Sequence, residues 1–353
     1  MTQLSHSQNH SNSDATALEA LEQLYQRETL SFQQTRALFN DIMQGKLNDT
    51  LLTAVLVALK MKGEHIDEIA GAASAMVNNA KPFPHITYPL SDIVGTGGDG
   101  HNTINVSSAA AIVAACCGIK VAKHGNRSVS SKSGSSDLFA GFGMDLMMTP
   151  QSAKRCLDEA NLCFLAAPNY HAGVAHAMPV RTCLKTRTLF NILGPLANPA
   201  QPQNGVYGVY TPTLLGIYAE VLQKLGHQNA LVVHGDGLDE IALHGTTEVR
   251  HINNGKIQSM QFEAADFGAT PANIDAIKGG EPAQNVEFTK AALSGTGKAA
   301  HVDAIAMNAA ALLWVNQAQR SLSDCFDQAK AVMSSGEALN TIEHAASISQ
   351  KGA

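Results

Sequence analysis

The stretch that decides the fold is residues 92–127, DIVGTGGDGHNTINVSSAAAIVAACCGIKVAKHGNR. Its pattern predicts a strand, a glycine-rich loop, a helix and a second strand, at residues 92–94, 95–100, 105–117 and 119–122. Roughly 28 residues separate the ends of the two strands, which is the length of one βαβ crossover. We therefore expect two parallel neighbouring strands within an α/β fold.

Helical patterns dominate the chain before this stretch. A capping box at Ser31–Gln34 opens one helix, and Gly45 ends it. Two further runs follow, an almost wholly apolar one at 51–61 and an Ala-rich one at 66–77. A proline-rich linker at 82–89 then leads into the first strand.

The chain divides into three predicted parts. Residues 1–14 are rich in Ser, Asn, Gln and His, so we expect a disordered tail there. Residues 15–85 are expected to form a helical domain, and residues 86–353 a larger α/β domain. The later part shows further strand patterns and one strongly apolar helix, at residues 163–166, 205–210, 230–234 and 303–315. The predicted fold class is α/β with a small all-α N-terminal domain.

The composition excludes several classes of protein. Of 353 residues, 45% are hydrophobic and 15% are charged, which rules out wholesale disorder. The net charge of −6 argues against non-specific nucleic-acid binding as the main function. The longest apolar run, residues 109–117, falls well short of the roughly 18 residues of a membrane span. Six cysteines without a C-x-x-C pair, together with no signal-peptide pattern, predict reduced thiols and a cytoplasmic protein.

The loop after the first strand, Gly95-Thr-Gly-Gly-Asp-Gly100, lets its backbone approach a ligand because glycine has no Cβ. It matches the G-x-G-x-x-G pattern of dinucleotide-binding proteins, which also requires an acid at the end of the second strand. Lys123 occupies that position, and the helix begins near Asn105 rather than at the last glycine. A nicotinamide site is therefore not expected, and a plain turn is the alternative.

The loop after the second strand is strongly basic. Residues 120–132 contain four cations, several hydroxyls and no acid, namely Lys120, Lys123, Arg127 and Lys132 with Ser128, Ser130 and Ser131. Ligands bind beyond the carboxyl ends of parallel strands, so we expect both loops to face one site. Clustered cations and hydroxyls suit a multiply charged phosphate ligand. A solvated run of surface charge is the alternative.

Three acidic side chains complete the predicted site. Asp99, on the glycine-rich loop, suits the hydroxyls of a bound sugar. Asp239 and Glu240 follow another strand and a glycine-rich turn, and oxygen ligands in small number fit Mg²⁺. Ser107 is placed to cap its helix or to bind the metal. The alternative for Asp239 and Glu240 is a pair of surface charges.

The motifs together resemble a known family. They are Gly95-Thr-Gly-Gly-Asp99, Asn105-Val-Ser-Ser108, Lys123-His-Gly-Asn-Arg-Ser-Val-Ser-Ser131 with Gly134-Ser135, and Gly237-Leu-Asp-Glu240. In this combination, the chain is similar to the anthranilate phosphoribosyltransferases along nearly its whole length. The resemblance implies a mainly parallel sheet of the nucleoside phosphorylase/phosphoribosyltransferase type, in a domain that binds phosphoribosyl pyrophosphate. It also implies that helices from about 172–198 join the helical domain, and that two helical domains form a homodimer.

The reaction implied by the resemblance belongs to tryptophan biosynthesis. The amine of anthranilate attacks C1 of 5-phosphoribosyl 1-pyrophosphate, giving N-(5-phosphoribosyl)anthranilate and pyrophosphate with Mg²⁺. Lys123 and Asp99 are the implied catalytic residues. We expect Lys123, loop N–H groups and the metal to neutralise charge on the leaving pyrophosphate, without a covalent intermediate on a side chain.

The resemblance also assigns binding residues. Those implied for phosphoribosyl pyrophosphate are Gly95, Gly98, Asp99, Thr103, Asn105, Val106, Ser107, Ser108, Lys123, His124, Gly125, Asn126, Arg127, Ser128, Val129, Ser130, Ser131 and Ser135. Those implied for anthranilate are Gly95, Asn126 and Arg181, and those for Mg²⁺ are Ser107, Asp239 and Glu240. On the acceptor side, His171-Ala-Gly-Val174 departs from the family's usual His-Pro-Ala-Met.

Two other functions are open alternatives at this point. A pyrimidine-nucleoside phosphorylase shares the architecture and a basic, Ser-containing loop, but lacks the Gly-Thr-Gly-Gly-Asp and Gly-Leu-Asp-Glu motifs. A non-catalytic paralogue would use the basic loop to bind nucleic acid, and the net charge of −6 argues against it. The expected partners are therefore small-molecule substrates and a second copy of the chain, with no nucleic acid and no membrane.

Overall fold

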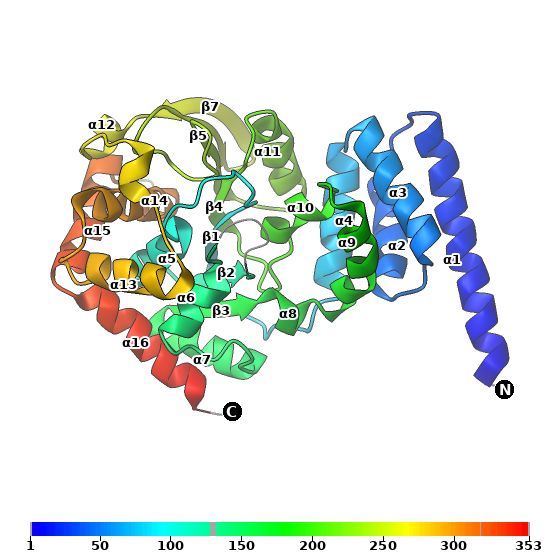
Figure 1. Cartoon of the computed structure of the whole chain (residues 1–353), viewed down its shortest axis with the longest axis horizontal. Helices are drawn as coiled ribbons and strands as arrows, with labels where there is room; N and C mark the ends of the chain where they lie inside the picture. The colour runs from blue at the N-terminus through cyan, green and yellow to red at the C-terminus, as the bar shows by residue number, and fades with distance from the viewer. Residues whose placement is uncertain (1, 128–131, 318, 352–353) are drawn as a thin grey trace.

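The computed structural model describes residues 2–127, 132–317 and 319–351. Figure 1 shows two parts side by side, a helical bundle that contains the N-terminus and a larger part built on a sheet. The predicted site residues Ser128, Val129, Ser130 and Ser131 lie outside the described residues. Within the described ranges, no helix is both long enough and apolar enough to cross a membrane.

The sheet has seven strands in the order β3-β2-β1-β4-β5-β6-β7. Their bounds are β1 (Ser91–Gly95), β2 (Val121–Gly125), β3 (Leu162–Ala166), β4 (Asn204–Gly208), β5 (Asn229–Gly235), β6 (Thr247–Asn253) and β7 (Lys256–Phe262). The first five strands pair in parallel. The predicted α/β class with a mainly parallel sheet is therefore confirmed, and the expected crossover joins the neighbouring strands β1 and β2.

An antiparallel hairpin of β6 and β7 extends the sheet, and neither strand is among the predicted ones. Asn254 and Gly255 form its turn, with φ of 48° and 75°, and Asn-Gly favours such a turn. The turn signal was therefore present. The strand was missed because polar and apolar residues of β7 do not alternate regularly.

Two apolar cores lie against the sheet. One contains α5 (Val106–Cys116) and α14 (Ala299–Asn316), which pack on each other through many buried alanines. The other joins α11 (Leu214–Lys224) to the helical bundle. The remaining helices of the larger part are α6 (Ser135–Gly141), α7 (Pro150–Ala160), α8 (Ala167–Tyr170), η2 (Gly194–Leu196), α12 (Ala264–Phe267), η3 (Ile274–Ile277), α13 (Pro282–Leu293), α15 (Leu322–Ser334) and α16 (Glu337–Gln350).

The bundle begins with α1 (Thr2–Tyr25), α2 (Phe32–Met43), α3 (Asp49–Lys62) and α4 (Ile66–Asn78). The predicted capping box is present, because the Ser31 hydroxyl accepts from Gln34 N and the Gln34 side chain accepts from Ser31 N. The tail predicted to be disordered, residues 1–14, is instead largely helical. Its helix continues N-terminally from Leu21 and Leu24, which are buried in the bundle core.

A segment that follows α8 returns the chain to the bundle. It comprises η1 (Ala172–Ala177), α9 (Met178–Leu184) and α10 (Phe190–Leu193). η1 packs on α2, α9 on α3 and α10 on α4, and Figure 1 shows α9 and α10 beside these helices. Buried residues of this segment belong to the core that also includes β4 and β5. The segment therefore lies between the bundle and the sheet.

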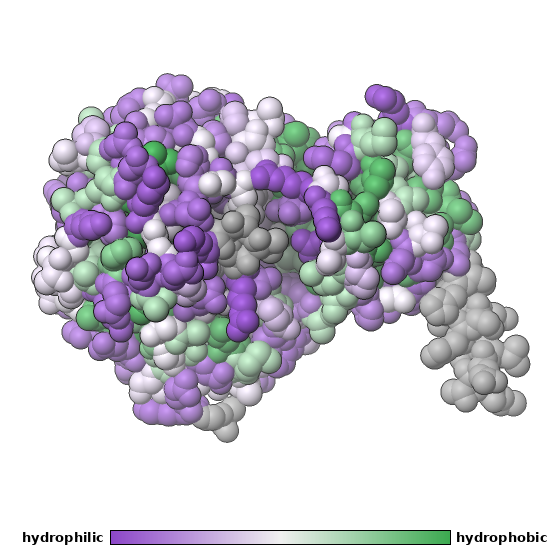
Figure 2. Space-filling model, viewed as in Figure 1, coloured by the Kyte–Doolittle hydropathy of each residue, from purple (hydrophilic) through white to green (hydrophobic). Residues whose placement is uncertain are grey.

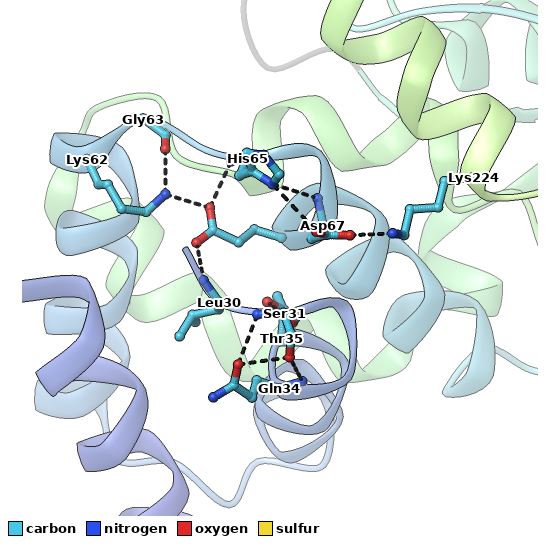
Figure 3. A network of polar contacts seen from close by, with 10 residues as sticks. Leu30, Ser31, Gln34, Thr35, Lys62, Gly63, His65, Asp67 and Lys224 are labelled. Carbon is cyan, nitrogen blue, oxygen red and sulfur yellow. Dashed lines mark hydrogen bonds and ion pairs between the residues drawn. The ribbon is translucent and has the colours of Figure 1, made fainter. Parts of the chain in front are cut away.

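Glu68 is a buried carboxylate that ties three bundle helices together. Its side chain is 0% exposed and accepts from Leu30 N at 2.9 Å, His65 N at 2.8 Å and Lys62 Nζ at 2.9 Å. Figure 3 shows Leu30, Lys62 and His65 converging from the start of α2, the end of α3 and the start of α4. Because Glu68 compensates the nearly buried Lys62 ammonium, the bundle depends on it.

We expect Glu68→Ala to lower the free energy of unfolding by about 3 kcal/mol, because it leaves a buried ammonium without its counter-charge and two N–H groups without their acceptor. Denaturant unfolding measures the change. The control is Lys290→Ala, which breaks the exposed Lys290–Glu287 pair and should cost less than about 1 kcal/mol. Equal losses in the two variants would contradict the buried role of Glu68.

Candidate functional site

The two predicted loops leave adjacent strands at the same edge of the sheet. β1 ends at Gly95 and β2 at Gly125, and β4 ends at Gly208 on the other side of β1. Because these strands are parallel, their carboxyl ends lie together. The arrangement places the glycine-rich loop between the basic loop and the end of β4, where ligands bind in open α/β sheets.

Asp239 reaches this edge from a turn that follows β5. Asp236 and Gly237 form the turn with φ of 44° and 98°, and an isolated bridge joins Gly235 to Leu238. The turn directs Asp239 to the glycine-rich loop, where its Oδ2 accepts from Gly97 N at 2.6 Å. The acid is therefore bound to a loop far from it in sequence.

Two glycines make room for Asp239. A Cβ on Gly208 would lie 1.7 Å from the Asp239 carbonyl oxygen, and a Cβ on Gly95 would lie 2.1 Å from its Oδ2. Neither approach is possible for a residue with a side chain. Glycine at the ends of β1 and β4 is therefore required for the carboxylate to enter the sheet edge.

Glu240 lies against the start of α5. Its Oε1 accepts from Ser107 N at 3.1 Å, and Ser107 is the second residue of the helix. Asn105 is the N-cap residue, as the sequence predicted for the helix start. The positive end of the helix dipole and the free N–H groups of the first turn favour an acid at this position.

The carboxylates repel one another in this buried environment. Burial and the adjacent Asp99 raise the pKa of Asp239 to about 7. Burial and Asp239 raise the pKa of Glu240 to about 8, against the Ser107 hydrogen bonds, which lower it. The site therefore holds more negative charge than its neighbours compensate, and a bound cation would relieve the repulsion.

The donor set of this cluster fits Mg²⁺. Asp239, Glu240 and the Ser107 hydroxyl offer oxygen ligands from two elements, and Mg²⁺ binds through few carboxylates and retains several waters. Among the described residues, no group of three or more His, Cys, Asp or Glu side chains is arranged around a single ion. The cluster thus fits a metal shared with a ligand's oxygens and does not form a complete protein cage.

Lys123 is a buried cation close to these acids. Its side chain is 1% exposed, and its Nζ donates to Ile93 O at 2.6 Å. Burial lowers the pKa of Lys123, whereas the charges of Asp92, Glu240 and Asp239 raise it. The ammonium therefore lies where it interacts electrostatically with both the acidic cluster and Asp92.

Asp92 stabilises the charge of Lys123, and Asn198 binds Asp92; neither residue is among the predicted site residues. Asp92 Oδ2 accepts from Asn198 Nδ2 at 2.8 Å and from His124 N at 3.3 Å. Asn198 Nδ2 also donates to Ala122 O at 2.7 Å. Burial raises the pKa of Asp92 to about 6, although Lys123 lowers it. The one available signal was an acid inside an otherwise apolar strand.

Other residues predicted to bind phosphoribosyl pyrophosphate form a hydrogen-bond network between the loops. Asn105 Nδ2 donates to Ser133 O at 3.2 Å, and Asn285 Nδ2 donates to Asn105 Oδ1 at 3.1 Å. Ser135 Oγ donates to Asn126 O at 3.1 Å. These bonds fix the ends of the basic loop.

Several of the predicted site residues have side chains that are buried in the fold. The side chains of Val106 and Ser108 are buried in α5. His124 Nδ1 lies 3.1 Å from Gly194 O, and the His124 ring meets the His171 ring edge-on at 5.1 Å. Burial lowers the pKa of His124 to about 3, so its imidazole is neutral. Of the other predicted residues, Gly125 is the last residue of β2, whereas Gly98, Thr103 and Arg127 lie outside the helices and named strands.

Arg181 lies apart from the other predicted acceptor residues. It belongs to α9 on the bundle side, with its guanidinium 5.1 Å from the Phe190 ring centroid and its Nη1 3.8 Å from the Met178 sulfur. Gly95 and Asn126 lie at the sheet edge. Among the described residues, no carboxylate lies within ion-pair distance of Arg181.

Two family models match the chain, one over the helical bundle and one over the larger part. Residues 18–80 match the family described as glycosyl transferase family, helical bundle domain. Residues 87–339 match the family described as glycosyl transferase family, a/b domain.

Curated relatives match along nearly the whole chain. An anthranilate phosphoribosyltransferase of a Shewanella species is 52% identical over 342 residues, covering 96% of this chain and 99% of the relative. The protein of the same name from Shewanella baltica is 53% identical and covers 93% of this chain and 94% of its own.

Solved structures agree in fold. The anthranilate phosphoribosyltransferase of Thermus thermophilus has a TM-score of 0.88 at 37% identity, over 94% of this chain and 99% of that one. The enzyme of Saccharomyces cerevisiae in complex with PRPP and Mg has a TM-score of 0.88 at 30% identity, over 95% and 98%. Its complex with 4-fluoroanthranilate has a TM-score of 0.86 at 29% identity, over 95% and 98%.

Proposed function

The chain belongs to the anthranilate phosphoribosyltransferase family, and on this premise we propose that it transfers the phosphoribosyl group of 5-phosphoribosyl 1-pyrophosphate to the amine of anthranilate. The products are N-(5-phosphoribosyl)anthranilate and pyrophosphate, in tryptophan biosynthesis. The observation that carries the proposal is that Asp239 and Glu240 meet the glycine-rich loop after β1 and the start of α5, at the sheet edge where β2 also ends. The relatives favour this activity over a pyrimidine-nucleoside phosphorylase and over a nucleic-acid-binding paralogue.

Donor binding is assigned to the loops after β1 and β2. Glycines of residues 95–100 expose backbone N–H groups, and residues 123–135 supply cations and hydroxyls. Such groups complement the phosphates of the donor. Asp99 is assigned to the ribose hydroxyls, because it lies on the glycine-rich loop beside Asp239.

Mg²⁺ is assigned to Asp239, Glu240 and Ser107. The raised pKa values of the two acids support a cation there, and a yeast relative is described in complex with PRPP and Mg. When bound, the metal supplies positive charge beside the oxygens of the leaving pyrophosphate.

Lys123 is assigned to the same task from the protein side. Its buried ammonium interacts electrostatically with Asp239 and Glu240, and we assign it to stabilise the charge that develops when the C1–O bond breaks. The amine of anthranilate is already nucleophilic when neutral, so orientation supplies much of the remaining acceleration. No side chain forms a bond to the sugar, and isolation of a ribosylated enzyme would refute this step.

Anthranilate is assigned to the space between the two parts, with Arg181, Gly95 and Asn126 as its neighbours. Arg181 has no carboxylate partner among the described residues, which suits the acceptor's carboxylate. The yeast relative described with 4-fluoroanthranilate supports an aromatic amine as acceptor.

A homodimer through the bundle is also proposed, for a cytoplasmic protein. Among the described residues, the exposed large apolar side chains on the bundle and on α9, which packs on it, are Leu18, Tyr25, Met61 and Met178; one more, Met147, lies in the larger part. Figure 2 shows apolar residues gathered over the bundle, whereas the face of the larger part shown there is mostly hydrophilic. We infer a helical domain of residues 15–85 with 172–198, and an α/β domain over the rest of 86–353.

The test is a direct assay with phosphoribosyl pyrophosphate, Mg²⁺ and anthranilate. Loss of anthranilate fluorescence, with equal amounts of pyrophosphate released, is the expected result. A phosphorylase would instead cleave uridine or thymidine with phosphate, and a nucleic-acid-binding paralogue would leave anthranilate unchanged. Either outcome would contradict the proposed activity.

A further inference from the structure

Arg187 contacts the glycine-rich loop from the other part of the molecule. Its Nη2 donates to Gly98 O, and its guanidinium carbon lies 3.8 Å from the centroid of the Tyr210 ring. The contact is close, since a Cβ on Gly98 would lie 3.0 Å from Arg187 Nη2. Arg187 therefore contacts the loop and at the same time stacks on the ring of Tyr210, which follows β4.

The loop depends on contacts of this kind because it has few of its own. Gly97, Gly98 and Gly100 have φ of 69°, 81° and 84°, and glycine costs the most conformational entropy when it is fixed. Three contacts fix the proximal half of the loop: Gly97 N donates to Asp239, Tyr210 N to Thr96 Oγ1, and Thr96 N to Gly208 O. Beyond Gly97, the Arg187 side chain binds the main chain of the loop from outside it.

The charge of Arg187 is not used in an ion pair. No carboxylate lies within ion-pair distance of it in the parts of the chain that the structure describes. Its partners are a carbonyl oxygen and an aromatic face, which the planar guanidinium satisfies together and an ammonium does not. The planar guanidinium therefore fixes the position of the Gly98 carbonyl group, and its positive charge raises the electrostatic potential beside the loop.

The location of Arg187 relates the loop to the bundle. It lies between α9 and α10, which pack on α3 and α4, whereas Gly98 and Tyr210 follow β1 and β4. We propose that Arg187 is a positioning residue for the donor, which fixes the Gly97–Gly98 turn in the conformation that binds phosphoribosyl pyrophosphate. This inference rests on the proposed function, because it takes that loop to be the donor site.

The test compares Arg187→Ala with the wild-type enzyme in the presence of Mg²⁺. The Kd and the KM of phosphoribosyl pyrophosphate should each rise about tenfold or more, because a loop displaced by about 1 Å can cost up to about a hundredfold. The KM of anthranilate should stay within about twofold, and Tm should not change. Low concentrations of guanidinium ion should restore part of the donor affinity.

Two further variants separate the geometry from the charge. Arg187→Lys keeps the cation but not the planar fork, so its donor Kd should lie between those of the wild type and Arg187→Ala. Lys185→Asn removes a cation two residues away in a left-handed backbone conformation that Asn accepts, and should leave the donor Kd unchanged.

An unchanged donor Kd in Arg187→Ala, or a rise in both KM values with a lowered Tm and no response to guanidinium, would overturn the inference. The wild-type titration separates this result from a failure of the proposed function. If the wild-type enzyme binds no phosphoribosyl pyrophosphate, the proposed function itself is wrong.

Discussion

Asp239→Asn is expected to lower kcat/KM for phosphoribosyl pyrophosphate at least tenfold. The variant preserves the size of the side chain between Gly95 and Gly208, and the amide oxygen still accepts from Gly97 N. It removes one of the charges that we assign to Mg²⁺, and the loss of a metal-site group typically costs 10–100-fold in affinity or activity. Steady-state rates over a range of Mg²⁺ concentrations measure the effect, and excess Mg²⁺ should restore part of the activity.

Asp236→Asn is the matched control for this prediction. Asp236 lies in the turn before Asp239, its side chain is 67% exposed, and its φ of 44° is one that Asn adopts readily. The control should leave kcat/KM within about twofold, as substitutions of exposed surface groups usually have small effects. Near-normal turnover by Asp239→Asn at limiting Mg²⁺ would break the assignment of the metal site.

Lys123→Met is expected to lower kcat/KM at least tenfold, mainly through kcat. The ammonium is buried close to the acidic cluster. A hydrogen-bond donor that stabilises developing charge in such a site typically contributes 10²–10³-fold to kcat. The methionine side chain has a similar length but carries no charge. Rates measured at a near-saturating concentration of phosphoribosyl pyrophosphate should show the loss in kcat, because the ammonium stabilises the transition state in which pyrophosphate departs.

Lys120→Met separates this effect from a general loss of basic charge. Lys120 Nζ donates to Leu157 O at 2.7 Å and lies 5.2 Å from the Tyr88 ring, outside the acidic cluster. The control should retain kcat. Equal losses of kcat in the two variants would show that Lys123 has no specific role in departure of the leaving group.

The part of the fold that local patterns determine was predictable. Gly95–Gly100 and the basic residues from Lys123 onward mark strand ends, and the crossover length determines that the strands are parallel. The helix cap at Ser31 is a local motif and is present. The helix over residues 2–14 was not predictable from composition, since it depends on continuity with the buried turns of α1.

The candidate site was predictable where a motif places its chemistry on a strand end. The acids of the turn after β5 do meet the glycine-rich loop and the start of α5. Asn198 and Arg187 carried no such signal, because their partners are Asp92 and the carbonyl oxygen of Gly98, far away in the sequence. An amide or a guanidinium that binds the main chain leaves no spacing pattern, so only the folded arrangement reveals it.

A crystal structure of the enzyme with phosphoribosyl pyrophosphate and Mg²⁺ would locate the donor and the metal. We expect electron density for the donor between residues 95–100 and the loop that follows β2, with the metal joining the pyrophosphate to Asp239 or Glu240. Density for the donor at another edge of the sheet, or a metal bound to the pyrophosphate without either acid, would contradict this expectation.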